Sequence, residues 1–154
     1  MPVIKDPSSL PARRTTIYPP PFDKGFERRA KRALTDLLGL TQFGINLTTL
    51  EPGAQSSHRH WHAKEDEAIV VLEGVLTLIT DEGERELMAG MIAGFPAGVP
   101  NGHHLVNRSR QPATYVEIGT RASEDDVVYS DVDLKAKKRA GVFSFARKTG
   151  EPLP

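Results

Sequence analysis

The sequence predicts an all-β fold of the sandwich or barrel type. Between about residues 41 and 119, short segments rich in β-branched and apolar residues follow one another. Glycine or proline separates them at short intervals, and Asp81-Glu82-Gly83 supplies one clear turn. Short, closely spaced strands with turn signals between them are typical of an all-β sandwich or barrel rather than of a βαβ fold.

The first forty residues predict an extended arm that precedes the barrel. Half of the twelve prolines lie within the first 21 residues, where they disfavour a helix or a central strand. We expect residues 1–40 to pack on the barrel or on a partner subunit. A weak helical period over residues 23–38 also predicts a helix that Gly39 would end.

Residues 41–121 contain the expected strands of the barrel. Residues 42–48 alternate strictly, with Phe43, Ile45 and Leu47 on one face of the strand. Further strands are expected at 67–73, 75–80, 84–88, 91–95, 103–108 and 113–119. The run 68–72 is apolar on both faces, so one face fills the barrel and another surface must cover the other. The arm or a second subunit would do this, and the sequence therefore predicts a homodimer.

The pattern after residue 122 is polar and irregular, and we expect residues 122–154 to form a C-terminal extension. One or two helical turns are expected over residues 131–139. A final strand is expected from Gly141 onward.

Composition excludes several classes of protein. Twenty basic and twenty acidic residues cancel, which removes any global electrostatic argument for a nucleic-acid or membrane partner. The basic run over residues 28–32 and the acidic run over 81–86 are expected to be solvated surface. The absence of cysteine excludes disulfides and thiolate ligands. No apolar stretch suits a signal peptide or a membrane span, so we expect a cytoplasmic protein.

All five histidines lie in two short clusters, at residues 58–62 and at 103–104. Alternate residues of a strand face the same side, so His60 and His62 can converge on one point. Glu67 has the opposite parity in a continuous strand, but a turn over residues 63–66 would bring it to the same side. Imidazole and carboxylate are usual ligands of Zn, Fe, Mn, Ni and Co, and the clusters therefore predict a site for one divalent transition metal per chain.

The spacing around these clusters resembles the two motifs of the cupin superfamily, G-x5-H-x-H-x3,4-E-x6-G and G-x5-P-x-G-x2-H-x3-N. The positions that match the first motif are Gly53, His60, His62, Glu67 and Gly74, with one additional residue after Gly53. The positions that match the second are Gly90, Pro96, Gly98, His103 and Asn107, with two additional residues after Gly98. The resemblance covers about residues 44–121. It is to small single-domain cupins that include sugar-phosphate-isomerase-like proteins.

The resemblance implies a double-stranded β-helix, or jelly roll, in which the metal lies inside the barrel. It also implies that the metal ligands are His60, His62, Glu67 and His103. A frame shifted by two residues would use His58, His60 and Glu65 instead, because Glu65 stands five residues after His60, but only Glu67 keeps the six-residue distance to Gly74. In the second cluster His103 and His104 both remain candidates, and His103 is favoured because it keeps the x3 distance to Asn107.

Several other polar residues are candidates for the site. Tyr115 and Glu117 share a strand face and are the candidate catalytic residues, through contact with substrate or with a ligand histidine. The polar face of residues 42–48 either lines the pocket mouth or is solvated; its members are Gln42, Asn46 and Thr48. Three arginines either bind an anionic substrate or lie on the surface: Arg59, Arg108 and Arg121.

These residues favour a metal-dependent enzyme of isomerase or dioxygenase type, acting on a small, polar, oxygen-rich substrate. Three imidazoles and one carboxylate leave coordination positions free for substrate, which a closed structural site lacks. The alternative is a cupin that binds or senses a sugar or an organic acid without turnover. The fold alone does not choose between these functions.

Overall fold

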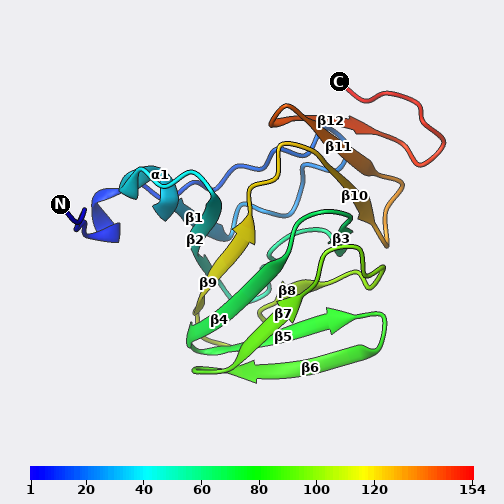
Figure 1. Ribbon diagram of the computed structural model, residues 1–154. Coiled ribbons are helices and arrows are strands. Elements are labelled where there is room, and N and C mark those ends of the chain that lie inside the picture. Colours follow the sequence, from blue (N-terminus) through cyan, green and yellow to red (C-terminus); the bar gives the residue numbers. More distant parts are fainter.

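Twelve strands make up nearly all of the regular structure in the computed structural model, which describes residues 1–154 (Figure 1). The helical elements are the 3₁₀ helix η1 (Pro7–Ser9) and the short helix α1 (Leu34–Leu38). The prediction of an all-β fold is therefore confirmed.

The strands form three antiparallel sheets. The five-stranded sheet has the order β1 (Arg29–Ala33), β2 (Phe43–Leu50), β9 (Ala113–Thr120), β4 (Glu67–Glu73) and β7 (Ile92–Phe95). The four-stranded sheet has the order β12 (Val142–Ala146), β11 (Lys135–Arg139), β10 (Asp125–Tyr129) and β3 (His60–His62). The three-stranded sheet has the order β6 (Gly83–Met88), β5 (Val75–Thr80) and β8 (His104–Val106).

The inner face of the five-stranded sheet is divided between a hydrophobic core and a polar region. Leu50, Ala113 and Val71 are fully buried and belong to the main core, which continues onto β5, β6 and β8. Four residues along β2 from Leu50, the register places Asn46 opposite Glu117, and two residues further along β9 it places Gly119 opposite Glu67. Directly opposite residues of antiparallel strands point to the same side, so these polar groups share the interior with the core.

The outer face of the same sheet is apolar and partly open. Ile92 is 74% exposed, and Leu72 and Phe43 are also exposed. The N-terminal arm does not cover these residues. Instead it bonds to β1 through Arg13, while its aromatic residues Tyr18 and Phe22 pack against a second core beneath β10 and β11.

The prediction of a helix over residues 23–38 is wrong for most of that range. Residues 29–33 pair with β2 as a strand, and only the five residues of α1 are helical before Gly39, which ends α1 in the left-handed conformation at φ 70°. The pairing overrides the local pattern because it buries Arg29 and Ala30 against the barrel. The prediction that the basic run is solvated is therefore wrong for Arg29, which is buried.

The prediction of helical turns over residues 131–139 is also wrong. Residues 135–139 form β11, in which Ala136 and Lys138 face inward while Lys137 and Arg139 are exposed. A buried lysine hides this alternation in the sequence. Lys138 is 7% exposed and forms an ion pair with the equally buried Glu65. The final strand expected from Gly141 onward corresponds to β12.

The C-terminal segment is part of the barrel architecture, since β10 pairs directly with β3, the strand that carries His60 and His62. Figure 1 shows β10, β11 and β12 stacked at one end of the molecule, away from β5 and β6. None of the helices is long and apolar enough to cross a bilayer.

Candidate metal centre

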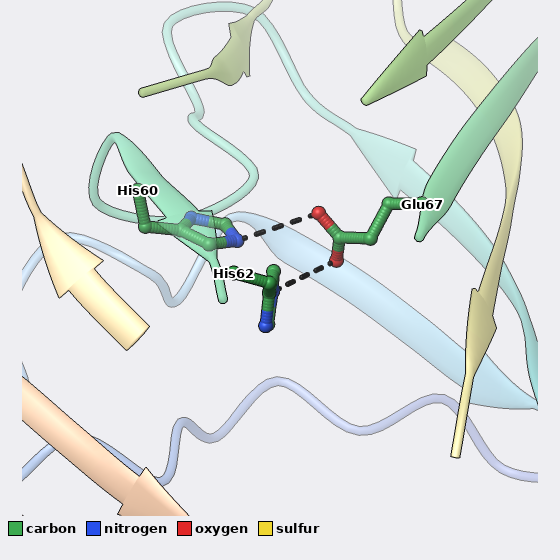
Figure 2. A group of neighbouring side chains, drawn as sticks. All are labelled: His60, His62 and Glu67. Atoms are coloured by element: carbon green, nitrogen blue, oxygen red, sulfur yellow. Dashed lines mark ion pairs between the residues drawn. The ribbon is translucent and has the colours of Figure 1, made fainter. Parts of the chain in front are cut away.

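Three side chains from β3 and β4 converge on one point inside the barrel (Figure 2). His60 and His62 alternate on β3 and present their Nε2 atoms to Glu67, the first residue of β4. The distances are 3.6 Å from His60 Nε2 to Glu67 Oε2 and 3.3 Å from His62 Nε2 to Glu67 Oε1. One potential ligand atom from each residue lies within 4.8 Å of the others.

The turn between the two strands makes this convergence possible. The backbone N–H of Ala63 donates to Asp126, and the carbonyl of His62 accepts from the N–H of Gly98. These bonds fix the end of β3 and let residues 63–66 change direction before β4 begins. The expected reset of register thus takes place in this turn.

His103 completes the group from a segment that forms an antiparallel bridge with His60. Its backbone bonds reciprocally with His60, and its Nε2 lies 2.6 Å from Glu67 Oε2. The ring stacks on Phe95 with 3.6 Å between centroids. His104 faces the other way, and its Nδ1 lies 2.8 Å from the carbonyl oxygen of Ser57. The structure therefore brings together the four residues that the sequence motifs suggest, with His103 rather than His104 beside Glu67.

The chemistry of the donor set fits a cation. His60 Nδ1 lies 2.8 Å from the carbonyl oxygen of His58, and His62 Nδ1 lies 2.6 Å from Asp125 Oδ2. A carbonyl oxygen and a carboxylate accept hydrogen bonds, so each Nδ1 carries a proton, and a ring with no second proton has its lone pair on Nε2. These lone pairs then face the Glu67 carboxylate, an arrangement that only protons or a metal ion between them can stabilise.

The pKa values of the group reflect the same opposition between the histidine nitrogens and the Glu67 carboxylate. Burial alone would lower the pKa of His62, but hydrogen bonds to Asp125 and Glu67 outweigh burial and raise the pKa to about 10. Burial would raise the pKa of Glu67, yet hydrogen bonds from His103, His60 and His62 hold it well below its usual range. Burial lowers the pKa of His103. Without a metal, the group therefore retains a proton on a histidine while Glu67 stays ionised.

Asp125 is a site residue that the sequence did not reveal. It is fully buried at the start of β10, where it accepts from His62 Nδ1 and, at 2.8 Å, from the backbone N–H of Lys64. Pairing of β10 with β3 brings it 63 residues along the chain to His62. No local motif marks this position, because its role depends on a pairing between distant strands.

His58 belongs to a different environment despite its place in the first cluster. Its Nε2 lies 2.8 Å from the carbonyl oxygen of Phe22, and its ring packs among aromatic rings of the arm and β10. These rings are Tyr18, Phe22, Phe26 and Tyr129. Glu65, the carboxylate of the shifted frame, is bound by Lys138 and by the N–H of Ala122.

A cavity of about 300 Å³ opens onto the four-residue group and is lined by His60, His62 and Glu67. Glu117 also lines it, and its Oε1 accepts from Asn46 Nδ2 at 3.2 Å and from Lys31 Nζ at 3.4 Å. Tyr115 lies deeper, in a smaller adjoining cavity that Glu117 and His103 also line. Burial raises the pKa of the Tyr115 phenol, so this group stays neutral.

The remaining polar candidates divide by location. Asn46 and Thr48 face the interior, whereas Gln42 is exposed. Each candidate arginine is held by acidic side chains: Arg59 by Asp81 and Asp131, Arg108 by Glu84, and Arg121 by Asp36. None of these three arginines lines the cavity at the four-residue group.

Comparison with known proteins places this architecture in a family. Residues 46–119 match the Cupin domain family. A sugar phosphate isomerase of the cupin superfamily from Silicibacter pomeroyi shares 45% identity, with a TM-score of 0.92 over 97% of this chain and 95% of that chain. A protein from Acidithiobacillus ferrooxidans, named provisionally for the same activity, shares 28% identity with a TM-score of 0.74, over 82% of this chain and 80% of that chain.

A polyketide cyclase from Streptomyces resistomycificus shares the fold, with 21% identity and a TM-score of 0.64 over 78% of this chain and 80% of that chain. No curated protein sequence matches the chain. The expected double-stranded β-helix is confirmed by these likenesses. The chain belongs to the cupin superfamily, as one of its small single-domain members.

Proposed function

We propose that the protein is a metal-dependent enzyme that isomerises a small, oxygen-rich substrate of the sugar phosphate class. The observation that carries this proposal is the convergence of three imidazole Nε2 atoms on Glu67 at one end of a polar cavity. His60, His62, Glu67 and His103 would hold one divalent transition metal. Zn, Fe, Mn, Ni and Co all suit this set of nitrogen and oxygen ligands.

The substrate class is supported by the likeness to the Silicibacter pomeroyi sugar phosphate isomerase. At 45% identity over almost the whole of both chains, the resemblance extends beyond the fold. A polar cavity of about 300 Å³ is also at the lower end of the size range of small-molecule sites.

A bound metal would act as a Lewis acid that polarises the carbonyl group of the substrate. Glu117 would serve as the base that removes the proton from the carbon next to the carbonyl group and returns it to the former carbonyl carbon, while a hydroxyl proton passes from the oxygen of the first carbon to that of the second. Asn46 and Lys31 both bind Oε1 of Glu117, which leaves Oε2 free to exchange the proton. Tyr115 is neutral and would act by donating a hydrogen bond rather than by accepting a proton.

The test is solvent isotope exchange in metal-loaded protein. Aldose and ketose phosphates incubated in D₂O should acquire deuterium at the carbon next to the carbonyl group, as followed by proton NMR. Glu117→Gln should lower the exchange rate by about a hundredfold or more and leave the metal content unchanged. Glu124→Gln is the matched control, because Glu124 forms only an exposed ion pair with Lys64. Equal rates in Glu117→Gln and wild type would refute the role of Glu117.

One observation favours the second candidate, a cupin that binds its ligand without turnover. Glu117, the candidate base, is held by Lys31 at 3.4 Å and by Asn46 at 3.2 Å, contacts that a purely structural carboxylate in a binding pocket would also make. Saturable binding of sugar phosphates with no isotope exchange would support this alternative. Oxygen consumption by iron-loaded protein would instead support the dioxygenase branch.

We also infer a homodimer, formed through the apolar outer face of the five-stranded sheet. The strand β2 turns Thr48 inward and Phe43 outward, so its apolar side faces away from the barrel. A continuous apolar face of this kind is typical of a protein interface. Sedimentation equilibrium should give twice the chain mass, and Ile92→Lys should yield monomers. A monomeric wild type at micromolar concentration would refute the dimer.

A further inference from the structure

The most unusual charge in the barrel interior is the guanidinium group of Arg29. Its side chain is buried, at 8% exposure, and it lines the cavity beside the four-residue group. Its two hydrogen-bond acceptors are backbone carbonyl oxygens, Ser56 O at 2.5 Å and Thr15 O at 3.0 Å. The Nε atom is buried and has no partner. No carboxylate compensates this cation, although a buried unpaired charge is costly.

The exposed arginines provide the contrast. Arg28, which precedes Arg29 in the sequence, pairs with Glu51, and Arg108 pairs with Glu84. Carboxylate partners are thus present at the surface, where an arginine needs them least, and are missing at the buried site. This distribution is typical of a cation that is kept free for a ligand.

Two more cations lie beside Arg29 in the same cavity wall. Arg13 and Lys31 are directly opposite across an antiparallel bridge, with backbone N–H···O bonds of 2.8 and 3.0 Å in the two directions. Both line the cavity. Directly opposite residues place their side chains on the same side, and like charges in such positions repel. Glu117 offsets part of the charge of Lys31, but no acidic side chain pairs with Arg13.

We propose that Arg29, Lys31 and Arg13 form an anion subsite that binds the phosphoryl group of a phosphorylated substrate. The inference rests on the proposed function for the identity of the substrate. A phosphate monoester would accept hydrogen bonds from the free N–H groups of Arg29 and would lie between the two opposed cations. Because the same cavity reaches His60 and Glu67, the phosphoryl group would anchor one end of the substrate while the carbonyl end approaches the metal ligands.

The experiment measures binding by isothermal titration calorimetry at low ionic strength, with protein both as purified and after EDTA treatment. The probes are inorganic phosphate, glucose 6-phosphate, glucose and gluconate. We expect glucose 6-phosphate to bind at least tenfold more tightly than glucose, and inorganic phosphate to compete with it. Arg29→Met should weaken glucose 6-phosphate binding by about tenfold to a hundredfold and should leave the glucose affinity unchanged.

Arg28→Met is the matched control and should retain the preference for the phosphorylated sugar. Circular dichroism and the melting temperature verify that each variant is folded. If Arg29→Met does not fold, the double variant Arg13→Gln/Lys31→Met is used, and it should lose the preference by about tenfold or more. Equal affinity for glucose and glucose 6-phosphate in wild type, or tighter binding of gluconate, would overturn the phosphoryl subsite. So would an unchanged preference in the folded variants.

The outcome is separable from that of the proposed function. In His60→Ala, metal binding should be lost while the preference for glucose 6-phosphate remains, since the cations do not depend on the metal. In metal-loaded wild-type protein, a preference for glucose 6-phosphate without any isotope exchange would refute the isomerase proposal and support the subsite. Isomerisation of unphosphorylated sugars with no phosphate preference would do the reverse.

Discussion

The five histidines divide into two groups that differ in what their two ring nitrogens contact. His60, His62 and His103 direct Nε2 toward Glu67 inside the barrel. His58 and His104 each use a ring nitrogen to bond a backbone carbonyl, outside the converging group. Within each cluster the nearest members of the two groups are only one or two residues apart in sequence.

The difference shows that strand parity alone does not define a ligand. His58 has the same parity as His60, yet it precedes β3 and packs among aromatic rings instead of facing Glu67. For His60 and His62, Nδ1 is bonded to an oxygen, so the lone pair is on the atom that faces the site.

Removal of a converging histidine should abolish tight metal binding. For His60→Ala we expect the metal affinity to fall by more than about a hundredfold, which exceeds the usual effect of losing an outer partner. The matched change His58→Ala should leave the metal content of the folded protein unaltered. Elemental analysis of protein purified without a metal-affinity tag measures both, and equal metal loss in the two variants would break the contrast.

Loss of the Asp125 carboxylate should weaken metal binding without removing a ligand. Asp125→Asn keeps the shape of the side chain but no longer holds His62 Nδ1–H through a charged bond, so the affinity should fall about tenfold to a hundredfold. Competition with a chelator of known affinity measures this. Asp126→Asn is the control, because Asp126 pairs at the surface with Arg139. An Asp125→Asn protein with wild-type affinity would show that orientation of His62 is unimportant.

Metal affinity should rise with pH in the neutral and mildly alkaline range. The pKa of His62 in the metal-free protein is about 10, above the ordinary 6.5, so a metal must displace its proton. The raised pKa stabilises the metal-free fold fully below pH 6.5, and that contribution is lost as pH rises toward 10. Titration of metal between pH 6 and 9 should show affinity increasing by up to about tenfold per pH unit. A pH-independent affinity would contradict the proton on His62.

The two non-converging histidines should affect stability only. His58→Ala removes a ring that packs against four aromatic neighbours, and we expect a loss of about 1–3 kcal/mol in the free energy of unfolding. His104→Ala removes one hydrogen bond and should cost about 1 kcal/mol. Urea denaturation of metal-free protein measures both. A larger loss for His104→Ala than for His58→Ala would reverse this order.

The parts that sequence predicts well are those governed by local pattern. Alternation and glycine turns predict the strands β2, β4 to β9, and the motif spacing predicts which histidines surround Glu67. Features that depend on distant pairing do not appear in local patterns. Burial of Arg29 requires β1 to join β2, and the role of Asp125 requires β10 to join β3. The inward position of Lys138 cannot be predicted locally, because the residue that neutralises its charge lies 73 positions away in the sequence.

The pairing of β3 with β10 has a consequence for how the chain resists digestion. The strand that bears His60 and His62 has β10 as its sheet neighbour, and β10 in turn supplies the buried carboxylate behind His62. A metal ion bound to His62 would therefore also restrain the last thirty residues, because β10 contacts His62 through Asp125. If the centre binds a metal, a protease should therefore cleave the C-terminal segment more slowly in metal-loaded than in metal-free protein.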